Sequence, residues 1–176
     1  MKNENVFEGD LSKANFPDRY FDLVTLYNVL EHTHNPQESL KEIRRILKDG
    51  GFLAIQVPNI NSWQLRIFKK NWAAVDVPRD LYYFNPDLLG GILKKERFSD
   101  FSVDYFNSWW HPPTFTISLF PWSAPQFFWQ DANPAWKSIF NRSIWALVTL
   151  TIAPVFTFFE QLFRHSAIVT VYARKS

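Results

Sequence analysis

The sequence predicts an α/β fold with a mostly parallel sheet, and three stretches carry that prediction. Residues 21–27 and 52–57 are short apolar runs rich in strand-forming residues, as in strands buried on both faces. Between them, Asn35-Pro36-Gln37-Glu38 combines a good N-cap residue with proline at the first helical position. A strand, a helix and a strand in this order form a crossover unit with parallel strands.

The other elements follow from similar local signals. The first helix is expected to end at Asp49-Gly50-Gly51, because glycine adopts the left-handed C-terminal conformation without a steric penalty. A second capped helix is expected from Asn85-Pro86 to about Glu96. Further strands are expected at residues 98–106 and 167–173.

Composition excludes several classes of protein. The chain has 176 residues, of which 47% are hydrophobic and 20% charged, which is ordinary for a soluble domain with a core. A net charge of only +2 gives no basic excess for nucleic acid, so none is expected as a partner. The lack of cysteine removes disulfides and thiolate sites and suits a reducing compartment. With a polar N-terminus and no secretory signal, a cytoplasmic location is expected.

Residues 107–163 differ from the rest of the chain. They contain six of the eight tryptophans but only four formal charges. We therefore expect an aromatic-rich, hydrophobic helical insert or cap that interrupts the fold, between a core at 1–106 and a last core strand at 164–176.

Four segments, in this order and spacing, resemble a known family: Phe21-Asp22-Leu23-Val24, Asn28-Val29-Leu30-Glu31-His32, Leu47-Lys48-Asp49-Gly50-Gly51 and Val57-Pro58-Asn59. They are similar to the second half of a class I S-adenosylmethionine-dependent methyltransferase, of the broad group that includes ubiquinone-pathway O-methyltransferases. The resemblance implies a partial doubly wound, Rossmann-like sheet whose last strand is antiparallel. It also implies S-adenosylmethionine as cofactor, bound at the carboxyl ends of the central strands.

By this resemblance, Asp10 would accept a hydrogen bond from the adenine amino group, which is a donor, with Leu11 beside the ring. The backbone of Asn28 and Val29 would line the pocket near the sulfonium. The alternative for Asp10 is a cap or turn with no contact to the cofactor.

Glu31 and His32 are the candidate catalytic residues. In the resembled enzymes a glutamate also precedes them, and the set can bind a divalent cation; here that position is Asn28. An amide oxygen is a weaker ligand for a hard cation than a carboxylate, so no metal site is predicted. His32 is instead predicted as a general base, because histidine side chains in general can exchange a proton near neutral pH, and removing a proton from a hydroxyl makes it a better nucleophile. The alternative is that the pair only orients the following loop.

Trp72, Arg79 and Tyr83 are candidate substrate-binding residues. Their surroundings resemble a segment of bacterial methyltransferases acting on cell-envelope sugars and lipids, although Asp80 stands where those have histidine. The resemblance implies a lid over the cleft that places these side chains near the acceptor. The alternative is that the aromatic residues only pack the lid against the sheet.

No two of the five glycines form the family's cofactor turn after a strand, and the ribose-binding acid is also absent, so both are expected upstream. The later strands would still form a contiguous half-sheet with an unpaired edge near Val24. The predicted function is methyl transfer to a small, lipid-linked or sugar-linked acceptor within a longer protein, with oxygen favoured over nitrogen or carbon as the methylated atom. This chain alone is expected to be inactive. The alternative is a non-catalytic remnant that binds a membrane or a partner.

The uncharged run at 144–159 is shorter than the roughly 20 residues of a membrane span and is interrupted by Pro154. Aromatic residues beside Lys137, Arg142 and Arg164 suit a segment at a membrane interface, so peripheral contact through 137–164 at the inner face of a membrane is one expectation. The other is an intramolecular cap that completes the core or builds an acceptor pocket.

Overall fold

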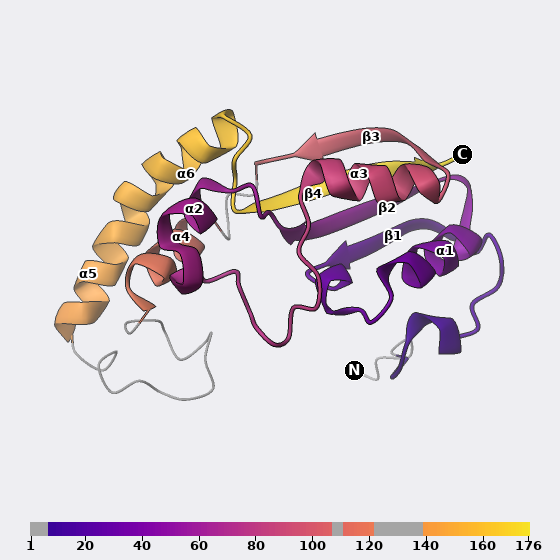
Figure 1. Ribbon diagram of the computed structural model, residues 1–176, viewed down its shortest axis with the longest axis horizontal. Coiled ribbons are helices and arrows are strands. Elements are labelled where there is room, and N and C mark those ends of the chain that lie inside the picture. The colour runs from indigo at the N-terminus through magenta and orange to yellow at the C-terminus, as the bar shows by residue number, and fades with distance from the viewer. Residues whose placement is uncertain (1–6, 107–110, 122–138) are drawn as a thin grey trace.

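A four-stranded sheet covered by two helices forms one end of the molecule, and a group of helices forms the other (Figure 1). This computed structural model describes residues 7–106, 111–121 and 139–176. Five of the six tryptophans of the aromatic insert, and Lys137, lie outside the described residues. The predicted division of the chain into a core and an aromatic-rich insert therefore stays a prediction.

The sheet has the order β1-β2-β4-β3. Its strands are β1 (Phe21–Tyr27), β2 (Leu47–Pro58), β3 (Phe98–Asp104) and β4 (Ile168–Lys175). β1 and β2 are parallel, whereas β4 runs antiparallel to both of its neighbours, β2 and β3. The predicted antiparallel last strand is therefore confirmed. The prediction of a mostly parallel sheet holds for the strand directions, since β1, β2 and β3 run the same way. The sheet is nevertheless mixed, because β4 lies between β2 and β3 and pairs antiparallel with both.

β1 lies at the edge of the sheet, as the sequence predicts for the strand around Val24. Its large side chains Leu23 and Tyr27 are 54% and 55% exposed. Along its outer side the backbone groups of β1 have no neighbouring strand among the described residues. Such an edge can template further strands.

Helix α1 (Pro36–Ile46) begins as predicted, because the Asn35 side chain accepts a hydrogen bond from the backbone N–H of Glu38 at 3.2 Å. The predicted end at 49–51 is wrong. α1 ends at Ile46, because Leu47 already has extended backbone and pairs with Phe21 as the first residue of β2. Gly50 does take a positive φ of 76°, but within β2.

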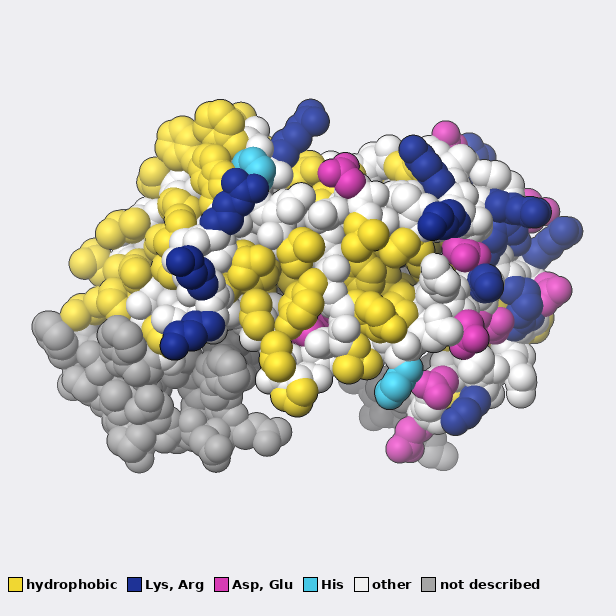
Figure 2. Space-filling model, viewed as in Figure 1, with side chains coloured by type: hydrophobic (Ala, Val, Ile, Leu, Met, Phe, Trp, Pro, Cys, Tyr) yellow, Lys and Arg dark blue, Asp and Glu magenta, His cyan; other side chains and the backbone are white. Residues whose placement is uncertain are grey.

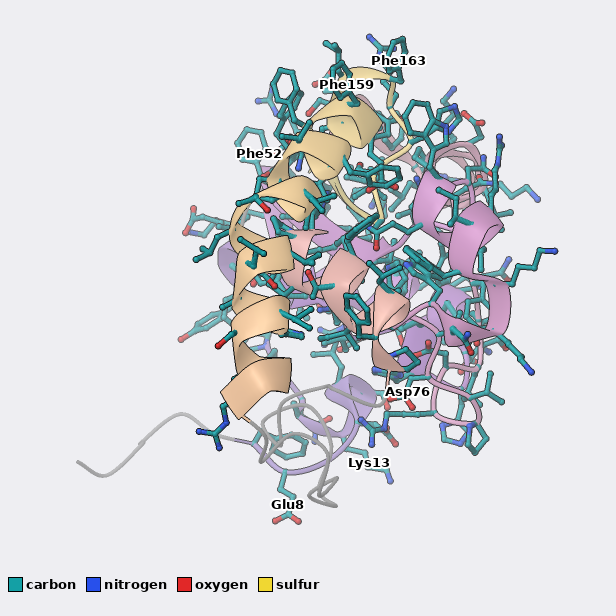
Figure 3. The ribbon with its side chains drawn as sticks, turned by 90° about the vertical axis from the view of Figure 1, so that its left-hand side faces the viewer. Glu8, Lys13, Phe52, Asp76, Phe159 and Phe163 are labelled. Atoms are coloured by element: carbon teal, nitrogen blue, oxygen red, sulfur yellow. The ribbon has the colours of Figure 1, made fainter. Side chains whose placement is uncertain are left out.

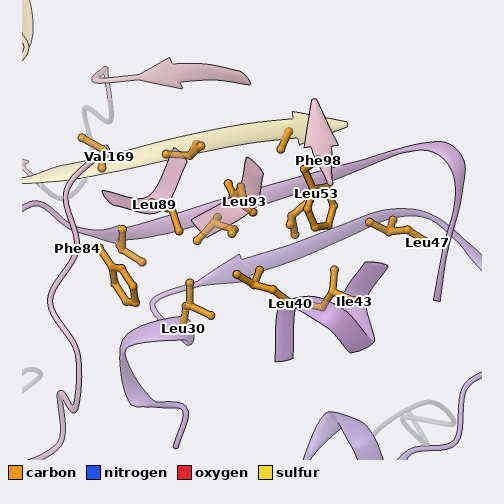
Figure 4. Close-up of a cluster of buried hydrophobic side chains, with 14 residues drawn as sticks. Leu30, Leu40, Ile43, Leu47, Leu53, Phe84, Leu89, Leu93, Phe98 and Val169 are labelled. Atoms are coloured by element: carbon orange, nitrogen blue, oxygen red, sulfur yellow. The ribbon is translucent and has the colours of Figure 1, made fainter. Parts of the chain in front are cut away.

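Helix α3 (Pro86–Lys95) starts at the predicted cap, where Asn85 accepts a hydrogen bond from the N–H of Leu88 at 2.8 Å. α1 and α3 pack on the same face of the sheet and bury the main core between them (Figure 4). Residues that Figure 4 labels include Leu40 and Ile43 of α1, Leu89 and Leu93 of α3, and Leu53 and Val169 of the sheet. This core holds the ends of β1 and β2 in place.

The helical end of the molecule consists of α2 (Trp63–Phe68), α4 (His111–Leu119), α5 (Ile139–Leu150) and α6 (Ile152–Leu162). A second, smaller cluster lies among these helices and contains Phe115, Val148 and Ala153. α5 and α6 follow one another with a break at Thr151 and form the outer wall (Figure 1). Pro154 lies in the first turn of α6, where its missing N–H costs no helical hydrogen bond.

Candidate active site

The chain makes a sharp turn where β1 ends. Asn28 has a φ of 52°, a left-handed conformation that asparagine tolerates better than most residues, and its N–H donates to Gln56 O at 3.0 Å. The short 3₁₀ helix η2 (Leu30–His32) follows directly. This turn buries Glu31, which is 2% exposed, and leaves the side chain of His32 at 34% exposure.

The segment from Trp72 to Phe84 docks onto η2. The backbone N–H groups of Leu81 and Tyr82 both donate to the carbonyl oxygen of Glu31, at 2.9 and 3.2 Å. The Tyr82 hydroxyl donates to His34 O at 3.1 Å. These bonds fix the distant segment beside the end of β1, and its role as a lid stays a prediction.

His32 is paired with Asp80. Its Nδ1 atom lies 3.2 Å from Asp80 Oδ1 and 3.2 Å from the carbonyl oxygen of Arg79. Both neighbours are acceptors, so Nδ1 carries the proton in the neutral ring. The lone pair is then on Nε2, the nitrogen that can accept a proton from a substrate.

Asp80 is itself held firmly. Its side chain is 3% exposed, and Oδ2 accepts a hydrogen bond from the N–H of Asp76 at 3.0 Å. Burial raises the pKa of Asp80, and the Asp76 N–H and His32 oppose that shift. Burial also raises the pKa of Glu31. The site thus combines two buried carboxyl groups with one half-exposed imidazole, an arrangement suited to acid–base chemistry. The sequence reasoning noted Asp80 only as a departure from the family pattern; nothing local in the sequence identifies it as the partner of His32.

Three predicted site residues have buried polar atoms without a hydrogen-bond partner among the described residues. These atoms are Glu31 Oε2, Trp72 Nε1 and the Tyr83 hydroxyl. A buried polar group without a partner costs about 1–3 kcal/mol, so such groups are usually satisfied by a ligand or water. Burial, followed by Asp80 and Asp76, raises the pKa of Tyr83, which keeps its hydroxyl protonated as a donor.

The predicted substrate-binding residues do not lie together in one set. Trp72 is 1% exposed and packs against Ala167 and Ile168, away from solvent. The Arg79 side chain is 73% exposed and pairs with Asp76 at 3.2 Å. Only Tyr83 has its polar end buried near Asp80. The contact of these three residues with an acceptor stays a prediction.

The predicted cofactor residues flank β1. Asp10 and Leu11 precede it, and the Asp10 carboxylate is 76% exposed with Lys13 at 3.6 Å as its ion-pair partner. Val29 is 43% exposed beyond the other end of the strand. No hydrogen bond or ion pair joins the two pairs among the described residues, and the contact of these four residues with the cofactor stays a prediction. In the described ranges, no three His, Cys, Asp or Glu side chains gather as a metal ion would need.

Comparisons with known proteins find similarity to methyltransferases over part of this chain. Residues 1–55 match a family model described as a methyltransferase domain. The ubiquinone/menaquinone biosynthesis C-methyltransferase of Cupriavidus taiwanensis is 33% identical over 75 residues, which cover 43% of this chain and 27% of that protein. The chain therefore spans about a quarter of that relative's length.

Two solved structures share the fold. A methyltransferase from Thermotoga maritima, described as dependent on S-adenosylmethionine, has a TM-score of 0.55 at 17% identity, covering 96% of this chain and 62% of the other. Another from Archaeoglobus fulgidus has a TM-score of 0.56 at 20% identity, covering 97% and 67%. The chain is therefore similar to part of a class I S-adenosylmethionine-dependent methyltransferase: residues 1–55 match the family model, and the two solved structures share the fold. S-adenosylmethionine is the cofactor that this similarity implies.

Proposed function

We propose that the protein transfers a methyl group to an acceptor hydroxyl oxygen and that His32 is the general base. The pairing of His32 Nδ1 with the buried carboxylate of Asp80 at 3.2 Å carries this proposal. S-adenosylmethionine, when bound, supplies an electrophilic methyl group. His32 Nε2 accepts the hydroxyl proton as the oxygen attacks, and Asp80 stabilises the imidazolium that results.

The other residues of the site have binding roles in this proposal. Asp10 and Leu11 receive the adenine, and the backbone at Asn28 and Val29 lies along the methionine portion. The Tyr83 hydroxyl, which is buried and has no hydrogen-bond partner in the described part of the chain, donates a hydrogen bond to the acceptor. Much of the rate then comes from holding the acceptor oxygen in line with the methyl group.

A carbon acceptor is the second candidate, because the Cupriavidus relative is named as a C-methyltransferase. The same dyad could deprotonate the hydroxyl of an aromatic ring and so activate a ring carbon. The acceptor itself would be a small, lipid-linked or sugar-linked molecule in either case. Nuclear magnetic resonance of the product separates the two, since O-methyl and C-methyl groups differ clearly in chemical shift.

The test uses the longest protein that is encoded in frame with this chain, called the longest in-frame product below, with labelled S-adenosylmethionine and candidate hydroxylated acceptors. His32→Gln should lower kcat by about a hundredfold or more. Asp80→Asn keeps an oxygen for the Asp76 N–H but loses the carboxylate, so kcat should fall with KM nearly unchanged. The acidic limb of the pH–rate profile should move as well. The control Asp87→Asn, an exposed site on α3, should leave kcat unchanged.

The proposal fails if the active protein keeps its kcat and pH profile in both His32→Gln and Asp80→Asn. If the unmutated protein transfers no methyl group to any acceptor, the result would instead favour the non-catalytic alternative. The cofactor distinguishes the two further, because a non-catalytic module has no need to bind S-adenosylmethionine.

A further inference from the structure

In helix α6 the polar side is buried and the apolar side is exposed, the reverse of a helix on the surface of a soluble protein. Its buried residues include the polar side chains Thr157, Glu160 and Gln161. Its exposed residues are apolar: Val155 at 60%, Phe158 at 53%, Phe159 at 47% and Leu162 at 54%. These four have the spacing i, i+3, i+4, i+7 and so form one stripe along the helix. In water, the polar face of a surface helix normally points outward.

The apolar stripe extends beyond α6 in both directions. Leu147 and Leu150 of α5 are 63% and 77% exposed, Ile152 is 57% exposed, and Phe163 after α6 is 57% exposed. We call these residues, with the four of α6, the outer face. Figure 2 shows apolar side chains over α5 and α6, and in Figure 3 Phe159 and Phe163 project from the end of α6. An exposed apolar surface of this extent indicates a binding site.

Basic side chains flank the outer face. Arg66 of α2 and Lys69 and Lys70 just after it are exposed, and Arg164 follows Phe163. None of these four has an ion-pair partner among the described residues. Lys and Arg side chains lie beside the apolar surface in Figure 2. The acidic residues labelled in Figure 3, Glu8 and Asp76, lie at the opposite end of that view.

The helical stretch Arg142–Leu162 comprises most of α5 and all of α6. Among the described residues it is the one helical stretch that is long and apolar enough to cross a membrane. The uncharged run at 144–159 looked too short for this, but the helix extends past it at both ends. Hydrogen bonds nevertheless tie the helix sideways to the domain. Glu160 binds Gln64 of α2, and Gln161 Nε2 lies 3.0 Å from Nδ1 of His111 in α4.

We propose that the outer face is a docking surface for an anionic phospholipid bilayer, with α5 and α6 lying parallel to the membrane plane. A helix surrounded by lipid would have to leave Gln64 and His111, which would strand buried polar groups. A helix in the plane keeps those bonds and inserts its apolar side chains into the interface, while the flanking cations meet the phosphates.

Flotation of the chain on a density gradient tests the proposal, since aggregates sink while vesicle-bound protein rises. The vesicles contain phosphatidylcholine alone, or phosphatidylcholine with one third phosphatidylglycerol. The chain should float with the anionic vesicles and much less with the neutral ones. Phe158→Ser combined with Leu162→Ser should weaken binding at least tenfold while the melting temperature stays within a few degrees. Lys69→Gln combined with Lys70→Gln should weaken it about fivefold per charge at low salt.

Phe156→Ser is the matched control, because Phe156 lies two residues before Phe158, on the inner side of the helix, with its ring centroid 4.6 Å from that of Phe115. This variant should lower the melting temperature. A parent chain that does not float with anionic vesicles overturns the proposal. Equal flotation with neutral vesicles overturns the anionic surface. A clearly lower melting temperature in the Phe158 and Leu162 variant would show that these side chains pack within the protein. A parent chain that is a dimer, with the variant a monomer, would show that the outer face is a protein interface. Either result also overturns the proposal.

Discussion

The carboxylate of Glu160 in α6 accepts two hydrogen bonds from Gln64 in α2, although the residues are 96 positions apart. The backbone N–H of Gln64 reaches Oε1 at 3.0 Å, and its side-chain amide reaches Oε2 at 2.8 Å. Both side chains are fully buried. This polar contact, together with the neighbouring pair of His111 and Gln161, makes the helical end of the molecule sensitive to pH.

Glu160 should make the protein less stable as pH rises. Burial raises its pKa to about 7 in the folded state, against 4.5 for an ordinary glutamate in water. The folded protein binds the proton more tightly, so the stabilisation is fully present below pH 4.5 and is lost as pH rises to 7. The two pKa values differ by the equivalent of about 3 kcal/mol. Urea unfolding of the parent and of Glu160→Gln at pH 5 and pH 8 measures this. Between pH 5 and pH 8, the free energy of unfolding of the parent should fall relative to that of the variant by about 2–3 kcal/mol. Equal changes in the two proteins would contradict the prediction.

His111 should have the opposite effect. Burial lowers the pKa of this histidine to about 4, from 6.5, with a neighbouring backbone group and Asp104 opposing the shift. The unfolded chain binds the proton more tightly, so stability is fully present above pH 6.5 and is lost as pH falls towards 4. His111→Gln should therefore flatten the loss of stability between pH 6.5 and pH 4.5, as followed by urea unfolding. A curve parallel to that of the parent would show that His111 is already accessible to water.

Two glycines should respond in opposite ways to alanine. At Gly51 a Cβ atom would lie 2.9 Å from Lys48 O and 3.2 Å from Asp22 O, both backbone atoms of the β1–β2 ladder. Gly51→Ala should destabilise the protein by about 1–3 kcal/mol. At Gly91 in α3 a Cβ would meet nothing within 4 Å, so Gly91→Ala should stabilise it by about 0.5–1 kcal/mol. Thermal unfolding measures both, and shifts of the same sign would contradict the packing at Gly51.

Asp10 should contribute to cofactor affinity if it accepts a hydrogen bond from adenine. In the longest in-frame product, Asp10→Ala should raise the Kd for S-adenosylmethionine about fivefold, the equivalent of roughly 1 kcal/mol. Asp10→Asn keeps an acceptor oxygen and should raise it less. Isothermal titration measures all three proteins. An unchanged Kd in Asp10→Ala would leave the residue with only the turn and its ion pair to Lys13.

The first half of the sheet could be predicted because its signals are local. The caps at Asn35 and Asn85 and the apolar run of β1 each lie within a few residues of the element that they define. The position of β4 between β2 and β3 could not be predicted from the residues alone, since Val171 finds its partners Ile55 and Val103 far away in the chain.

The candidate site shows the same limit. Glu31 and His32 stand in a recognisable segment, but Asp80 reaches His32 through a loop 48 residues later, and only the docking onto Glu31 O brings it there. The orientation of α6 was equally hidden. Its composition is compatible both with a membrane interface and with an intramolecular cap, and the buried hydrogen bonds of Glu160 and Gln161 decide that its apolar side faces out.

The central position of β4 also determines when the fold can form during synthesis. β3 pairs with β4 and not with β2, so it has no strand to join until residues 168–175 have left the ribosome. Until then β1 and β2 are the only paired strands among the described residues, and α5 and α6 emerge before this part of the sheet is complete. Nascent chains would therefore expose apolar helices early and close the sheet late, which favours folding with the help of a chaperone.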